Sequence, residues 1–107
     1  MDRPIGIILT SVDDASTAKK LARGLIEAGI AACVQVSAAG TSFYQWDNAV
    51  QEDAEYYLSI KAPPDRRNEI IEWLARQHPY EVPEIVVLEG HAAIAYAQWV
   101  SSTCQAP

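Results

Sequence analysis

The segment His78-Pro79-Tyr80-Glu81-Val82-Pro83-Glu84-Ile85 joins a helix-like stretch to an apolar run. Each proline fixes its own φ angle and disfavours helical backbone at the residue before it. His78 and Val82 are therefore expected to be extended, and the preceding helix must end by Pro79. A connection this stiff holds an imidazole, a phenol and carboxylates in nearly fixed directions, as a binding or assembly site requires.

The segments beside this proline loop show helix and strand patterns. Pro63-Pro64-Asp65 opens the helix before it, whose apolar stripe comprises Ile70, Leu74 and either Trp73 or Ile71. The run 84–89 after it is predicted to be a central strand that Gly90 ends. Residues 92–102 then form a short third helix, with an apolar side made by Ile94, Trp99 and Val100.

The N-terminal half repeats the alternation of strand and helix. Residues 5–12 are almost continuously apolar, which is typical of a strand buried on both faces. Asp13 or Asp14 caps a helix that Gly29 ends. A second strand begins at residue 30 or 31 and is interrupted by a bend at 37–40.

A long hairpin follows the bend. Its first strand is 41–46, Asp47-Asn48 is the turn, and its second strand is about 50–62. The second strand alternates, and its polar face is expected to be wet or to meet a polar partner; that face carries Gln51, Asp53, Glu55, Ser59 and Lys61.

The resulting order is β-α-β-β-α-β followed by one more helix. This order predicts one domain over residues 1–107, an α+β ferredoxin-like sandwich with an antiparallel four-stranded sheet, helices on one face, a long central hairpin and an added C-terminal helix. The hairpin's aromatic end, made by Phe43, Tyr44 and Trp46, would overhang the body. Because an exposed aromatic hairpin aggregates unless it is paired, we expect oligomerisation through the hairpin and the last helix.

Composition excludes several classes of function. The net charge of −6 and the pI near 4.7 argue against a nucleic-acid surface. The first apolar run is too short for a signal peptide or a membrane span, so we expect no membrane association and a cytoplasmic location. Sequence motifs of catalytic triads, zinc proteases, dinucleotide sites and P-loops are missing, which indicates a protein that is not an enzyme. Cys33 is expected to be a buried free thiol and Cys104 to lie exposed or mobile in a polar tail.

Over residues 7–101 the chain resembles the CutA divalent-cation tolerance proteins. The matching pieces, in order, are Thr10-Ser11 with Asp13-Asp14, Leu25-Ile26-Glu27, Ala31-Ala32-Cys33-Val34, Thr41-Ser42-Phe43-Tyr44-Gln45-Trp46, Glu52-Asp53-Ala54-Glu55, Lys61, the whole proline loop, and Tyr96 with Trp99. The resemblance implies a fold similar to PII signalling proteins and a tight homotrimer held by the hairpin and the C-terminal helix. It also implies a role in tolerance to divalent metals, and the alternative is a PII-like small-ligand sensor or a protein-anchoring scaffold without a metal role.

The resemblance also places a ligand cleft between subunits, beside the proline loop and the hairpin. In this chain the cleft residues are Tyr57, Lys61, His78, Tyr80, Glu81 and Trp99. The carboxylates of Glu52, Asp53, Glu55, Glu81 and Glu84 could bind a hard cation there. The other interpretation is that they solvate the strand face and pair with Lys61, Arg66 or Arg67.

His78 is the candidate metal ligand, with copper or another divalent cation as its ion. Copper-binding members of the family are thought to add a histidine just before it and a cysteine in the first strand. This chain has Gln77 and Leu9 at those places, and neither can replace an imidazole or a thiolate. A lone histidine before a proline is more often a hydrogen-bonded loop residue, and this is the other interpretation of His78.

Overall fold

The computed structural model describes residues 1–104 of the chain. Its elements follow one another as β1 Asp2–Val12, α1 Ala15–Glu27, β2 Cys33–Val36, β3 Gly40–Trp46, β4 Ala49–Ala62, the 3-10 helix η1 Pro64–Arg66, α2 Arg67–Gln77, β5 Val86–Ala93 and α3 Ile94–Thr103. The predicted order is confirmed, although the first strand begins earlier than expected and β2 begins only at Cys33.

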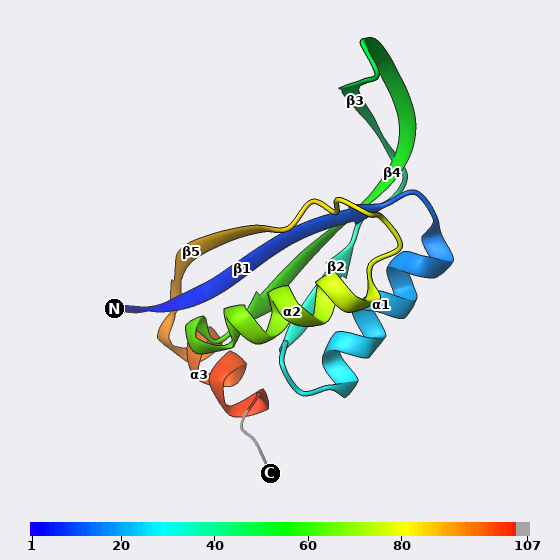
Figure 1. The fold of residues 1–107 in the computed structure, drawn as a ribbon. Coiled ribbons are helices and arrows are strands. Elements are labelled where there is room, and N and C mark those ends of the chain that lie inside the picture. The colour runs from blue at the N-terminus through cyan, green and yellow to red at the C-terminus, as the bar shows by residue number, and fades with distance from the viewer. Residues whose placement is uncertain (105–107) are drawn as a thin grey trace.

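The strands form an antiparallel sheet in the order β2-β4-β1-β5, and β3 pairs with β4 alone. Helices α1 and α2 cover one face of this sheet (Figure 1). The core between these layers is built from Ile8, Leu25, Ile60, Ile70 and Leu74, all fully buried. The structure therefore confirms an α+β fold with a C-terminal helix added to the sandwich.

Helix ends follow the sequence signals. Asp14 is the N-cap of α1, and its carboxylate accepts the Thr17 N–H at 2.8 Å. Gly29, just beyond the helix, has a φ of +74°, a conformation that glycine adopts without strain. At the other helix, α2 ends at Gln77, and His78 is extended with φ −72° and ψ 137°, as its place before a proline requires.

The hairpin projects from one end of the molecule as an arm, residues 40–55 (Figure 1). Asp47 and Asn48 have φ values of 51° and 62°, the left-handed pair that a two-residue hairpin turn needs. The arm is a two-stranded hairpin with no further strand beside it, because β3 pairs with β4 alone. It consequently exposes 66% of Phe43, 60% of Trp46 and 76% of Val50.

Strand β5 differs from its prediction in two ways. It lies at the edge of the sheet, paired with β1 only, rather than in the centre. It also runs past Gly90 to Ala93. Gly90 allows close approach rather than ending the strand, because a Cβ there would lie 2.8 Å from the Cδ1 of Ile7.

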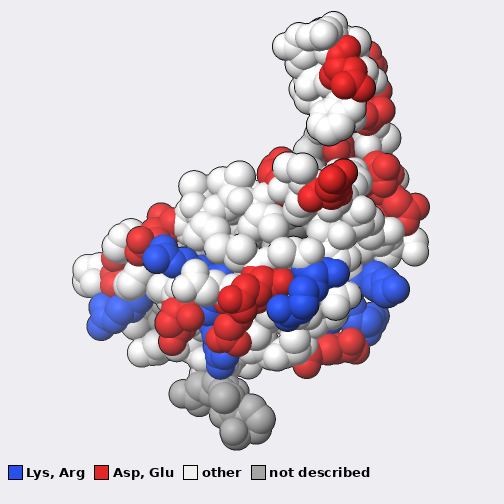
Figure 2. All heavy atoms as spheres, in the orientation of Figure 1, with Lys and Arg blue, Asp and Glu red and all other residues white. Residues whose placement is uncertain are grey.

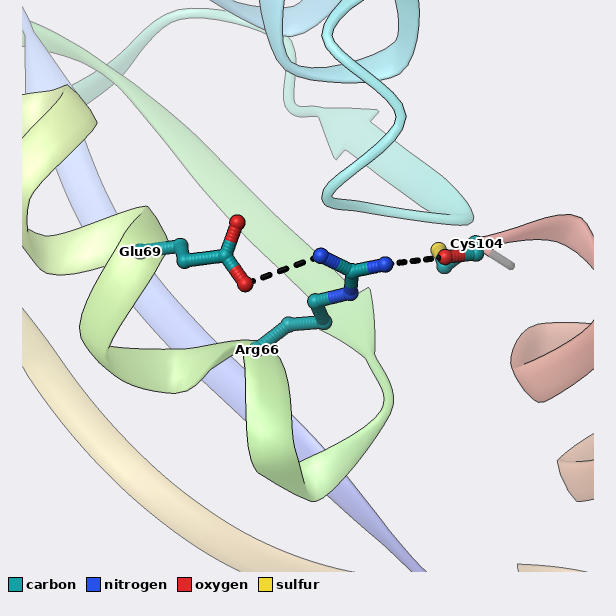
Figure 3. A network of polar contacts seen from close by, with 3 residues as sticks. All are labelled: Arg66, Glu69 and Cys104. Carbon is teal, nitrogen blue, oxygen red and sulfur yellow. Dashed lines mark hydrogen bonds and ion pairs between the residues drawn. The ribbon is translucent and has the colours of Figure 1, made fainter. Parts of the chain in front are cut away.

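The C-terminal helix is anchored at its end, which corrects the prediction for Cys104. The thiol of Cys104 is buried beside Ala32 and Val100, and burial raises its pKa. Its carbonyl oxygen accepts from Nη2 of Arg66 at 2.7 Å, while Nη1 of the same guanidinium contacts Glu69 at 2.8 Å (Figure 3). Cys33, by contrast, is half-buried rather than buried.

The apolar side of α3 also differs from the prediction. Ala97 and Val100 are its buried residues, and Trp99 is 47% exposed. Within residues 1–104, no helix has the length and apolar character that crossing a membrane requires.

Candidate functional site

The proline loop, residues 78–85, lies beside the end of β1 where the pairing of β1 with β5 stops. The last residue pair between β1 and β5 is Leu9↔Val86, so the β1 residues beyond it have no β5 partner. The His78 imidazole fills that place, with Nε2 lying 2.9 Å from the carbonyl oxygen of Ser11. Beyond the last residue pair between β1 and β5, the proline loop therefore covers this edge of the sheet in place of β5.

Both ring nitrogens of His78 are engaged. Nδ1 accepts the backbone N–H of Tyr80 at 3.1 Å, so Nε2 carries the proton and donates it to Ser11. The ring is buried, and burial lowers the pKa of His78, which keeps it neutral. The ring of Tyr80 packs edge-on against it, with centroids 4.8 Å apart.

This arrangement favours the hydrogen-bonded interpretation of His78. A neutral imidazole binds a metal through an unprotonated nitrogen, and here that nitrogen is already used by Tyr80. Across residues 1–104 the structure also contains no group of three or more His, Cys, Asp or Glu side chains placed to hold a metal ion. A metal at His78 would have to displace a hydrogen bond that shapes the loop.

Glu55 is buried and meets a polar partner, the second of the two alternatives expected for its strand face. Only 7% of the residue is exposed, because the proline loop lies over it and the Tyr80 hydroxyl donates to Oε2 at 3.4 Å. Strand alternation could not reveal this, since the cover comes from a segment 25 residues further on. The sequence feature that could have indicated the burial of Glu55 is Tyr80, because a partly buried phenol needs a polar partner.

Acidic and phenolic side chains gather where the arm leaves the body. Tyr44 of the arm donates to the Asp53 carboxylate, and this hydrogen bond raises the pKa of Tyr44. Figure 2 shows Asp and Glu along the arm and at its base, while Lys and Arg lie on the body. The predicted pairing of these carboxylates with Lys61, Arg66 or Arg67 is wrong for the described residues: Arg66 pairs with Glu69, and Lys61 donates to Gln35.

The predicted cleft residues are only partly brought together in one subunit. Tyr57 pairs with Ser11, the residue that His78 contacts, so Tyr57 and Tyr80 both lie near the arm base, and Glu81 is exposed on the same loop. Lys61 lies further along β4, opposite Ile7 and Cys33. Trp99 belongs to α3, at the other end of the sheet from the arm (Figure 1).

Exposed apolar side chains mark a second feature, on the arm and on the sheet face away from α1 and α2. On the arm they are Phe43, Tyr44, Trp46 and Val50. On β5, Val86 and Leu88 are 43% and 46% exposed, and they lie on the same sheet face as Leu9 and Ile7, their partners on β1. Together they form an exposed apolar surface on the single chain.

Comparison with known proteins gives the same family throughout. Residues 6–103 match the family described as CutA1 divalent ion tolerance protein. The Divalent-cation tolerance protein CutA of Pectobacterium atrosepticum is 30% identical over 106 residues, covering 95% of this chain and 96% of that protein. CutA from Synechococcus elongatus PCC7942 superposes with a TM-score of 0.91 at 33% identity, covering 95% of this chain and 91% of that one. CutA from the same organism has also been solved complexed with a Bis-Tris molecule, at 34% identity, a TM-score of 0.85, and coverage of 94% and 93%.

A third solved structure shares the fold at lower identity. It is that of the periplasmic divalent cation tolerance protein CutA from Archaeoglobus fulgidus, with a TM-score of 0.90 at 20% identity, covering 94% of this chain and 99% of that one. At that identity it supports the fold alone, and a cytoplasmic location for the present chain stays a prediction. The family match over residues 6–103, the relatives of 30% identity or more and the shared fold agree, and the chain belongs to the CutA1 divalent ion tolerance protein family.

Proposed function

We propose that the protein acts as a homotrimer held together by its arm. The observation that supports this most strongly is the set of exposed aromatic side chains on the arm, Phe43 at 66%, Tyr44 at 44% and Trp46 at 60%. Burying an aromatic side chain of this size contributes about 2 kcal/mol or more, which makes the arm the natural interface. As a CutA protein the chain serves divalent-cation tolerance and is not an enzyme.

We propose further that the trimer binds a divalent cation between subunits, at the acidic junction of arm and body. The described residues of one subunit contain no group of three ligands, so the proposed site takes its ligands from more than one subunit. Carboxylates suit such a shared site, and Glu81 and Glu84 are exposed on the proline loop beside the arm. His78 is not among the ligands in this proposal, because both of its nitrogens are used.

Calorimetric titration of the metal-free protein tests this proposal. With Cu(II) or Zn(II) we expect saturable binding to the native assembly, with the same stoichiometry in His78→Asn. A variant that stays folded but monomeric, such as Trp46→Ala, should lose the binding, because its subunits no longer share a site. Binding that survives in a folded monomer would contradict a site between subunits.

The second candidate function is that of a sensor for a small ligand, without a metal role. The observation in its favour is the set of exposed aromatic side chains among the cleft residues, Tyr57 at 39% and Trp99 at 47%, together with the related Synechococcus structure in complex with Bis-Tris. Tyr96 packs beside Trp99 with ring centroids 5.7 Å apart. Saturable binding of Bis-Tris by metal-free protein, with no response to Cu(II) or Zn(II), would favour this candidate.

A further inference from the structure

A groove runs between helix α1 and strand β2. Its volume is about 390 Å³, and its apolar lining comes from Ala22 and Ile26 of the helix and from Val34 and Val36 of the strand. Ile26 is 42% exposed, so the groove is open to water. Its residues belong neither to the arm nor to the open face of the sheet. The proposed trimer interface and the proposed metal site therefore leave this groove unused.

Strand β2 is the edge strand of the sheet beside the groove. Within residues 1–104 it pairs with β4 alone, so one side of its backbone has no strand partner there. The N–H of Ser37, the next residue after β2, donates to the Tyr57 carbonyl of β4 at 2.9 Å. Because the backbone groups of an antiparallel strand point alternately to its two sides, those of Val34 and Val36 point to the free edge. This edge can therefore accept an added strand.

An added strand would place some of its side chains in the groove. Residues directly opposite each other in a sheet project on the same face. Val34 and Val36 project towards the helix layer, where they pack against the core. The residues of the added strand opposite them would therefore lie between α1 and β2, beside Ile26. This surrounding is apolar, which favours aliphatic side chains at alternate positions of the segment.

The rim of the groove is basic, although the protein carries a net charge of −6. Lys19 and Arg23 line the groove, and Glu27 at its end is the one acidic residue of α1. Neither of the ion pairs found within residues 1–104 includes Lys19 or Arg23. Two cations beside an apolar floor complement a segment whose acidic residues lie next to its aliphatic ones.

We propose that the groove docks an extended segment of another protein, which adds a strand to β2. The segment carries aliphatic side chains that lie between α1 and β2, and carboxylates that pair with Lys19 and Arg23. Its backbone hydrogen bonds to Val34 and Val36 supply affinity, while the apolar lining and the basic rim supply selectivity. The occupant is not a second copy of this chain, because the proposed trimer uses the arm rather than α1.

Titration of the native assembly with a synthetic peptide tests the docking. The probe is a short capped peptide in which valine and glutamate alternate along one face of the extended chain and threonine occupies the other. We expect it to slow amide exchange at Val34 and Val36 about tenfold or more, because both amides gain a partner. The Gln35 amide, which points towards β4, should stay unchanged. Added salt should weaken the binding, because the basic rim is exposed.

A charge reversal on α1 provides the matched comparison. Arg23→Glu should lower the affinity for the probe about tenfold, and Lys19→Glu provides a second variant with the same expectation. Lys20→Glu makes the same change on the same helix outside the groove, and it should alter the affinity by less than about twofold. Ile26→Ala should weaken the binding of the probe without changing the mass of the assembly.

The proposal is overturned if a peptide with lysine in place of glutamate binds as well as the probe, or if the probe leaves exchange at Val34 and Val36 unchanged. It is also overturned if octanoate, an amphiphilic anion without a peptide backbone, shifts the NMR signals of the groove while the probe does not. A smaller assembly mass in Arg23→Glu would contradict it as well, because the groove would then belong to an interface between copies of this chain.

Discussion

Trp46→Ala is expected to weaken assembly by about 2–4 kcal/mol per subunit, the range of a central aromatic at a protein interface. Trp46 pairs with Ala49 beside the turn of the arm and is 60% exposed in the single chain, so it contributes little to the fold of that chain. Its loss should therefore leave the subunit folded and shift the association equilibrium by roughly thirtyfold or more. Sedimentation equilibrium over a range of protein concentrations measures this shift directly.

Ile26→Ala is the matched control for the arm. Ile26 is another exposed apolar residue, at 42%, but it lies on α1, in the helix layer away from the open face of the sheet. The control should leave the mass unchanged at every concentration. If Ile26→Ala dissociates the protein as strongly as Trp46→Ala does, the interface is not centred on the arm.

His78→Ala is expected to lower the free energy of unfolding by about 2–4 kcal/mol. The change leaves the buried Ser11 carbonyl and the partly buried Tyr80 N–H without their partner, and each unsatisfied group costs about 1–3 kcal/mol. Because burial lowers the pKa of His78, the contribution of His78 to the free energy of unfolding is complete above its ordinary pKa of 6.5. This contribution decreases as the pH falls. Urea unfolding at several pH values measures both effects.

His78→Asn separates the structural role of the side chain from a metal-binding role. An asparagine can accept the Tyr80 N–H through its own side-chain oxygen in an Asx turn, so it should recover part of the lost stability. It cannot reproduce the imidazole as a copper ligand. A variant that regains stability but loses Cu(II) binding would show that His78 is a metal ligand after all.

Local sequence signals predicted most of the fold because the residues that carry them act on their own neighbours. Asp14, Gly29, Pro79 and the Asp47-Asn48 turn set φ angles and caps within a few residues, and each acts as expected. The alternation of strand and helix then restricts the topology to few choices. The observed strand order β2-β4-β1-β5 differs from the prediction at β5, which was expected in the centre of the sheet.

The errors concern contacts between distant segments. Glu55 is covered by a loop, Cys104 is held by Arg66 38 residues earlier, and β5 lies at an edge because it pairs with β1 only. The candidate site depends even more on contacts between distant segments. Tyr80 and Trp99 lie at opposite ends of one subunit, so a cleft that contains both depends on a second chain, which no local pattern encodes.

The trimer is the central claim, and the mass of the native protein in solution tests it most directly. Sedimentation equilibrium at micromolar concentration should give three times the 11.7 kDa of one chain, about 35 kDa, with Trp46→Ala giving a smaller mass under the same conditions. A wild-type mass of 11.7 kDa would contradict the account, because the aromatic side chains of the arm would then be exposed to water without a partner.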